Sequence, residues 1–109
     1  MKLLQSYSIK KIFKKLNSKF PEIKEALIIS NEGMPLKANL SDKYEHVKIS
    51  GIALAILSAA EKITSEIKNG RFKELKIKCS NGYILGHWIK KNLILITFSE
   101  TDVDLEPLI

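Results

Sequence analysis

The feature that most constrains the fold is a helix-forming segment that is apolar on more than one side. Residues 50–60 read Ser-Gly-Ile-Ala-Leu-Ala-Ile-Leu-Ser-Ala-Ala, so isoleucine and leucine alternate with very small residues. A helix with one apolar stripe buries that stripe on its own domain. A helix with a second apolar side, lined by small residues, usually packs on another chain as well. The segment therefore predicts a domain that assembles with a second copy or a related chain.

The two sides of this helix are assigned from its three- and four-residue spacing. The side predicted to pack on a sheet contains Ile49, Ile52, Ile56, Ile63 and Ile67, with Ala53, Ala59 and Ala60. The flank and the outer side are expected to hold Gly51, Leu54, Ala55, Leu57, Ser58 and Glu61. Because Gly51, Ala55 and Ser58 have almost no side-chain bulk, a second helix could approach there. The alternative is an alanine-rich helix that packs only on its own sheet, and we favour dimerisation.

The remaining elements follow from periodicity and turn residues. The predicted order is a helix from residue 6 or 8 to 19, strands at 26–30 and 34–38, a long helix to about residue 68, and strands at 72–79, 83–89 and 93–96. Ser41 or Asp42 is expected to cap the long helix, with Glu45 completing a capping box. Residues 99–109 are acidic and predict no long third helix.

The strands differ in how many of their faces are apolar. Pro35 cannot donate a hydrogen bond to a neighbouring strand, so its strand is expected at a sheet edge. Residues 93–96 are apolar on both faces, which is typical of a central strand. The 72–79 strand alternates apolar residues with Glu74, Lys76 and Lys78, as a half-exposed strand does. Strands joined by hairpins and flanked by helices predict an α+β fold around one antiparallel sheet.

Composition predicts a single cytoplasmic domain. The chain has 109 residues, which is typical of one domain. No segment approaches the roughly 18–20 apolar residues that span a membrane, and the N-terminus lacks the apolar core of a signal peptide. The single cysteine, Cys79, cannot form an intrachain disulfide, which agrees with a reducing compartment. It is expected to be a half-buried strand residue.

The net charge of +6 invites a nucleic-acid interpretation, which the residue types do not favour. Arg71 is the only arginine among 18 basic residues, whereas guanine readout and phosphate clamping favour arginine. We therefore expect no nucleic-acid partner. The basic N-terminal helix could instead lie on a membrane surface. Its apolar side is expected to cover the sheet, so we favour core packing and no direct membrane insertion.

No residue pattern predicts catalysis, a metal or a cofactor. His46 and His87 are far apart, and no group of Cys, His and acidic residues has metal-ligand spacing. The glycine turns at 31–33 and 80–82 connect strands and do not precede helices, so neither is a phosphate-binding loop. Arg71, the only arginine, follows Gly70 and is best explained as a turn residue.

Four segments together resemble the Roadblock domain, also called the dynein light chain Roadblock type. They are the hairpin at 26–36, the helix at 50–62, the strand entry at 70–75 and the last two strands at 82–98. The resemblance covers about residues 6–98 of a single domain over 1–109, with 99–109 as an acidic tail, and is to a short archaeal or bacterial member. It implies a five-stranded antiparallel sheet of order 2-1-5-4-3 between helices, similar to profilin. The third helix of many members is expected to be short or absent.

The resemblance also implies a function. Roadblock proteins dimerise through the second helix and third strand, which here implies an interface of Gly51, Leu54, Ala55, Ser58, Glu61, Lys62, Leu75, Lys76 and Ile77. On this assignment, Ala55→Arg is expected to break the dimer without unfolding the monomer. The family implies a non-catalytic regulator or scaffold for a Ras-like small GTPase, as a homodimer or as a heterodimer with a paralogue.

Two other functions remain open. The chain could be a structural subunit of a motor or membrane-tethering complex whose binding is indifferent to nucleotide. It could also bind a small ligand on an uncovered sheet face around Lys76, Lys78 and Trp88.

Overall fold

The computed structural model describes residues 2–90 and 92–108, with side chains described from Ser8 onward. Within these residues the elements are α1 (Lys2–Lys19), β1 (Ile23–Ser30), β2 (Pro35–Asn39), α2 (His46–Glu66), β3 (Leu75–Cys79), β4 (Gly82–Ile89), β5 (Leu93–Ser99) and a 3₁₀ helix η1 (Glu106–Leu108). The predicted element order is confirmed, and η1 is an addition to it.

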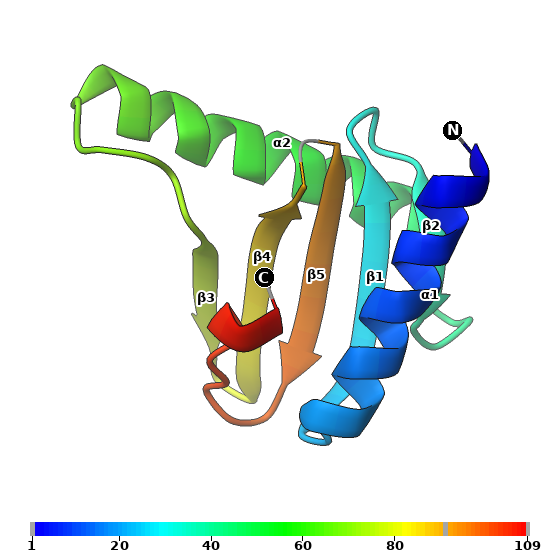
Figure 1. The fold of residues 1–109 in the computed structure, drawn as a ribbon. Coiled ribbons are helices and arrows are strands. Elements are labelled where there is room, and N and C mark those ends of the chain that lie inside the picture. Colours follow the sequence, from blue (N-terminus) through cyan, green and yellow to red (C-terminus); the bar gives the residue numbers. More distant parts are fainter. Residues whose placement is uncertain (1, 91, 109) are drawn as a thin grey trace.

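The five strands form one antiparallel sheet in the order β2-β1-β5-β4-β3. This confirms the α+β fold and the 2-1-5-4-3 order. Pro35 lies in an edge strand, and residues 93–96 of the central strand are at most 3% exposed. Helix α1 and the C-terminal segment cover one face of the sheet, and α2 crosses the other (Figure 1).

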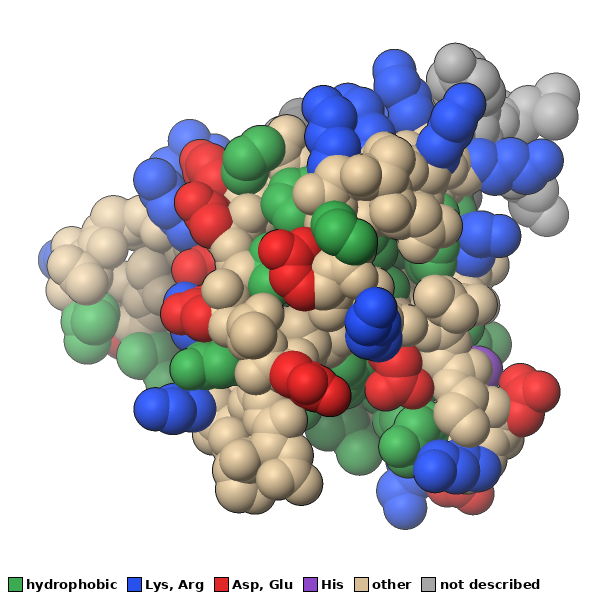
Figure 2. Space-filling view, turned by 90° about the horizontal axis from the view of Figure 1, so that it is seen from below, with side chains coloured by type: hydrophobic (Ala, Val, Ile, Leu, Met, Phe, Trp, Pro, Cys, Tyr) green, Lys and Arg blue, Asp and Glu red, His purple; other side chains and the backbone are tan. Residues whose placement is uncertain are grey.

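The face under α1 holds the larger cluster of buried residues. Ile9, Ile12, Phe13 and Leu16 of α1 pack there with apolar residues of β1, β4 and β5. Because the apolar side of α1 faces inward, its lysines face outward, and blue side chains gather along the upper right margin of the view from below (Figure 2). The expected core packing of this helix is therefore confirmed for the side chains described.

The C-terminal segment contributes to the same cluster. Val103 and Leu105, which lie in the segment expected to be only an acidic tail, are 8% and 1% exposed and belong to the core. Asp104, which lies between them, is exposed, as are the flanking Asp102 and Glu106. The third helix is short, as expected, because only the three residues of η1 form one.

The side of α2 that packs on the sheet differs from the predicted one. Its buried residues are Ser50, Ala53 and Leu57, of which Ala53 belongs to the predicted side. By contrast, Ile52, Ile56, Ile63 and Ile67 are 51%, 38%, 63% and 64% exposed. The physical reason is that the small residues Ser50 and Ala53 let α2 come close to the sheet, and the Leu57 side chain fills the space that remains between them. The isoleucine side of α2 is thus largely uncovered, and Leu57, expected on the flank, lies at the centre of the contact.

The beginning of α2 also differs from the prediction. Its N-cap residue is Glu45, which makes no side-chain cap hydrogen bond, so the capping box from Asp42 does not form. Ser41 instead lies beside the first turn, where its carbonyl oxygen is 3.1 Å from the His46 Nε2 atom. Strand β3 begins at Leu75, three residues later than predicted. Cys79 is exposed, contrary to the half-buried position expected for it.

Candidate interaction site

An apolar groove of about 130 Å³ runs beside α2 on the sheet face that the helix crosses. Its helical wall is the isoleucine side of α2, and its floor comes from the three strands β3, β4 and β5. The lining residues are Ile49, Ile52, Ala53, Ile56, Leu57, Leu75, Ile77, Ile84, Gly86, Ile96 and Phe98. All of these residues are apolar, so the groove offers no hydrogen-bonding or charged group to a polar ligand.

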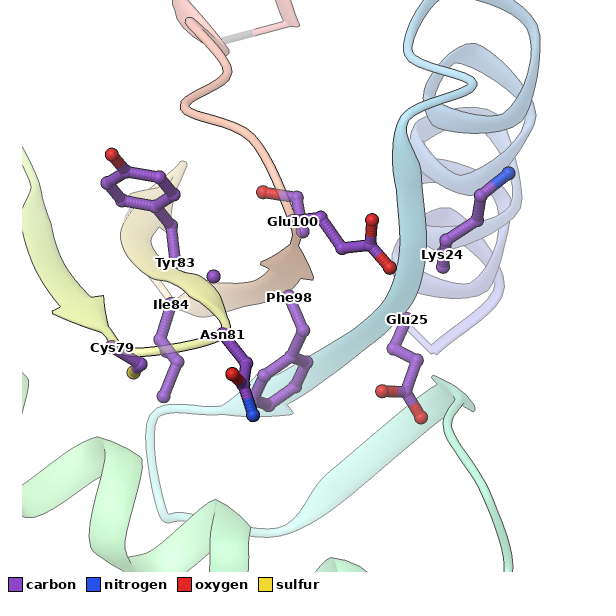
Figure 3. A pocket seen from close by; sticks show the side chains of 10 residues that line it. Lys24, Glu25, Cys79, Asn81, Tyr83, Ile84, Phe98 and Glu100 are labelled. Atoms are coloured by element: carbon purple, nitrogen blue, oxygen red, sulfur yellow. The ribbon is translucent and has the colours of Figure 1, made fainter.

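The strand alternation explains why the floor is apolar. Leu75 pairs with Gly86 and Ile77 pairs with Ile84, and paired residues of an antiparallel ladder point to the same face. The floor continues into a shallow hollow at the far end of the sheet. In Figure 3, Ile84 and Phe98 point to the side on which α2 lies, whereas Tyr83 points to the opposite side. The apolar surface therefore extends beyond the part that α2 covers.

Strand β3 is the edge of the sheet next to this groove. Within the described residues it pairs only with β4, so its outer backbone groups have no partner strand. Helix α2 crosses above the sheet and its C-terminal half continues past β3 (Figure 1). An open edge, a projecting helix and an apolar groove thus lie together, and large exposed apolar surfaces of this kind mark interaction sites.

The structure divides the predicted interface residues into two groups. Leu75 and Ile77 line the groove, and Lys76 points to the other face, where its Nζ atom lies 2.8 Å from an Asp102 carboxylate oxygen. The helical residues lie on the other side of α2. A Cβ atom on Gly33, in the β1–β2 turn, would stand 3.2 Å from Leu54 Cδ2 and 3.8 Å from Gly51 Cα.

The remaining helical residues belong to the same side as Gly51 and Leu54. They are Ala55, Ser58, Glu61 and Lys62, and the helical spacing separates them from the isoleucines. The strand residues therefore meet the isoleucine side of α2 and not the small-residue side. The sequence signal for the groove is the set Ile49, Ile52 and Ile56, which has three- and four-residue spacing.

The site proposed for a small ligand does not form. Lys76 and Lys78 pair with Leu85 and Tyr83, and Leu85 belongs to the core under α1. Trp88 packs instead against the cluster on the α2 face. The three residues named for ligand binding thus lie on opposite faces of the sheet, which removes the basis for that alternative.

His87 is the most buried titratable residue that the structure describes. Its side chain is 3% exposed, and its Nε2 atom has no hydrogen-bond partner. The nearest carboxylate oxygen, from Glu74, is 3.7 Å away. Burial lowers the pKa of the His87 imidazole below its usual value, and the carboxylates of Glu74, Glu106 and Asp104 offset part of that shift. The imidazole is therefore held in its neutral form.

The chemistry of the other polar residues is plain. No group of three or more His, Cys, Asp or Glu side chains within the described part of the chain could hold a metal ion. Arg71 is exposed in the segment between α2 and β3. Lys76 and Asp102 form an exposed ion pair that links β3 to the C-terminal segment. The hydrogen bond from Lys76 to Asp102 raises the pKa of the Lys76 ammonium group. None of the described helices is long and apolar enough to cross a membrane.

Comparison with known structures agrees with this architecture. A Roadblock/LC7 domain from Streptomyces avermitilis superposes with a TM-score of 0.68 at 12% identity, over 81% of this chain and 74% of that one. Myxococcus xanthus MglB gives 0.70 at 9% identity, over 90% and 76%. The gliding protein MglB of Thermus thermophilus gives 0.70 at 12% identity, over 93% and 79%. At identities this low, the structural similarity shows a shared fold alone.

Comparison at the level of sequence gives the family. A search of curated protein sequences finds no significant match. The family model of the Roadblock/LC7 domain matches residues 9–98, which include most of α1, all of α2 and the sheet except for the last residue of β5. The chain therefore belongs to the Roadblock/LC7 domain family.

Proposed function

We propose that this protein is a non-catalytic, dimeric regulator or scaffold that binds a Ras-like small GTPase. The observation that carries the proposal is the uncovered apolar groove beside the open β3 edge. A monomer would expose both to water, whereas a second copy would cover both. The family resemblance supplies the class of partner.

The proposed dimer continues the sheet from one β3 to the β3 of a second copy. Two antiparallel edge strands are related by a twofold axis perpendicular to the sheet. That axis would carry the projecting half of each α2 over the uncovered sheet face of its partner. The interface on this basis contains Ile52, Ile56 and Ile63 of the helix with Leu75, Lys76 and Ile77 of the strand. One of the similar solved structures is described as MglB with a tetrameric arrangement, so oligomers occur on this fold.

The small-residue side of α2 is the proposed contact for the GTPase. Gly51, Ala55 and Ser58 would remain outside this dimer, and Gly51 lies next to the β1–β2 turn. A side with little side-chain bulk allows the backbone of a partner to approach closely. Any activation of the partner would then work by repositioning the partner's own residues, because Arg71 lies in the α2–β3 connection and not on this side.

The test is binding to Ras-like GTPases loaded with GDP or with a non-hydrolysable GTP analogue. We expect binding that depends on the nucleotide, and we expect Ala55→Arg to weaken it. The matched control is Ala38→Arg, which adds the same charge at an exposed position of β2. Equal binding in both nucleotide states would favour the structural-subunit alternative. Absence of binding to every GTPase tested, by a protein that still dimerises, would contradict the proposed partner.

A further inference from the structure

The positive charge of this protein is concentrated in one segment. Residues 1–21 contain six lysines and no acidic residue, and residues 22–109 contain twelve basic and twelve acidic residues. The formal net charge of +6 is therefore carried entirely by α1 and the two residues that follow it. Charge asymmetry of this kind indicates an electrostatic interaction surface.

Folding presents Lys10, Lys11, Lys14 and Lys15 to solvent on one side of the helix. The opposite side of α1 is closed, because Ile9, Ile12, Phe13 and Leu16 are at most 9% exposed. Lys10, Lys11, Lys14 and Lys15 are all exposed and border one shallow hollow with Ser18. We call these four lysines the lysine face.

The lysine face is not neutralised by its surroundings. The ion pairs found among the described side chains join Lys48 to Glu45 and Lys76 to Asp102, so none uses an α1 lysine. In Figure 2 the blue side chains along the upper right margin form a group without red ones between them. Like charges that are held together without counter-charges create a potential that attracts an anionic surface.

We propose that the lysine face docks this protein on an anionic membrane surface. Lysine ammonium groups are compact point charges, which suit mobile lipid headgroups that need no fixed bidentate geometry. Clusters of four to eight basic residues on a helix are typical of such binding. The apolar side of α1 is already buried in the core, so the contact is peripheral and electrostatic and requires no insertion.

Nucleic acid fits this face less well. Arginine, which reads bases and clamps phosphates, does not occur in residues 1–21. Bases stack on exposed aromatic rings, whereas Phe13 and Phe20 are 6% and 8% exposed. The chemistry of the face thus favours a surface of many identical anionic groups.

The proposed dimer would strengthen this contact but is not required for it. A twofold axis perpendicular to the sheet would place both copies of α1 on the same side, which doubles the lysines directed at one plane. The α2 helices would then face away from the membrane, towards a GTPase. Two linked sites bind more tightly than either alone. Only this doubling rests on the proposed function.

The test is co-flotation with vesicles of phosphatidylcholine alone or mixed with phosphatidylserine. The wild-type protein is expected to bind only the mixed vesicles, and added salt is expected to release it. The variant is Lys11→Gln, Lys14→Gln and Lys15→Gln. The matched control, with the same loss of charge away from α1, is Lys43→Gln, Lys48→Gln and Lys73→Gln. At about fivefold per lysine near an anionic surface, the loss of three lysines should lower the affinity of the first variant by about a hundredfold, and that of the control far less.

Three outcomes would overturn the proposal. They are equal binding to both kinds of vesicle, equal losses in the two triple variants, and tighter binding of the wild type to duplex DNA than to mixed vesicles at the same salt concentration. Thermal melting of each variant shows whether it remains folded. Ile56→Glu, which is expected to give a monomer, separates this inference from the proposed dimer. If this monomer still binds mixed vesicles, although more weakly, the result supports the lysine face whether or not the protein binds a GTPase.

Discussion

Gly86 sets how closely α2 can approach the sheet. A Cβ atom at this position would lie 2.8 Å from Leu57 Cδ1 and 3.2 Å from Ile96 Cδ1, closer than side chains normally pack. We expect Gly86→Ala to lower the free energy of unfolding by about 1–3 kcal/mol, because Leu57 must leave its position or the helix must move away. Urea unfolding followed by circular dichroism measures the change.

Gly51 provides the matched control for this substitution. It lies within α2, and a Cβ atom there would meet nothing within 4 Å. Gly51→Ala is therefore expected to raise the free energy of unfolding by about 0.5–1 kcal/mol, since alanine loses less backbone entropy in a helix. A loss of stability at both glycines would mean that close packing under α2 is not the cause at Gly86.

His87 is expected to make stability depend on pH. Burial lowers the pKa of its imidazole in the folded state, so the unfolded chain binds the proton more readily. The part of the unfolding free energy that depends on a neutral His87 is fully present above the unfolded pKa of about 6.5. It is lost as pH falls from there through the folded pKa. His87→Gln, which cannot titrate, should flatten the dependence of unfolding free energy on pH below about 6.5. An unchanged slope in that variant would refute this role.

Among the elements of the fold, the C-terminal segment contributes more to the hydrophobic core than the sequence pattern predicts. Leu105 is 1% exposed and packs under the same sheet face as α1. We expect Leu105→Ala to lower the free energy of unfolding by about 2–5 kcal/mol, because it removes buried apolar surface and leaves a cavity. Glu106→Ala, at the neighbouring exposed position, should change it by less than about 0.5 kcal/mol. Similar values for the two variants would show that the segment lies outside the core.

Most elements could be predicted from the sequence because their signals are local. Pro35, the glycine turns and the doubly apolar run at 93–96 each restrict one strand to one kind of position in the sheet. The family resemblance then orders the strands. The C-terminal segment escaped prediction because Val103 and Leu105 alternate with acidic residues and lack the length of a strand or a helix.

The orientation of α2 could not be predicted by the same means. Its apolar residues cover two neighbouring arcs, and spacing alone does not say which arc meets the sheet. The choice depends on Gly86 of β4, because the missing side chain leaves room for Leu57. With Leu57 against the sheet, the isoleucines point away from it. The predicted interface therefore names the small-residue side of the helix, whereas the apolar groove lies on the isoleucine side, next to the predicted strand residues Leu75 and Ile77.

At the scale of the whole molecule, the two faces of the sheet have different surfaces. The face under α1 is closed by apolar packing and carries the lysine face on its outside. The face crossed by α2 is partly open and apolar. Charge on one side and exposed apolar groups on the other allow two simultaneous contacts, one electrostatic and one hydrophobic. The stability of such a protein is expected to depend on the partner that covers its apolar side.

That dependence leads to a prediction about concentration. If a second copy covers the groove, folding and association are linked, and a tenfold rise in protein concentration should raise Tm by roughly 3–5 °C. Ile56→Glu places a charge in the apolar groove and should give a monomer with a concentration-independent Tm. Ala55→Arg, one residue away but on the outer side, should leave the dimer intact. Sedimentation velocity and thermal melting distinguish the two, and a dimer broken by Ala55→Arg alone would restore the small-residue side of α2 as the interface between copies.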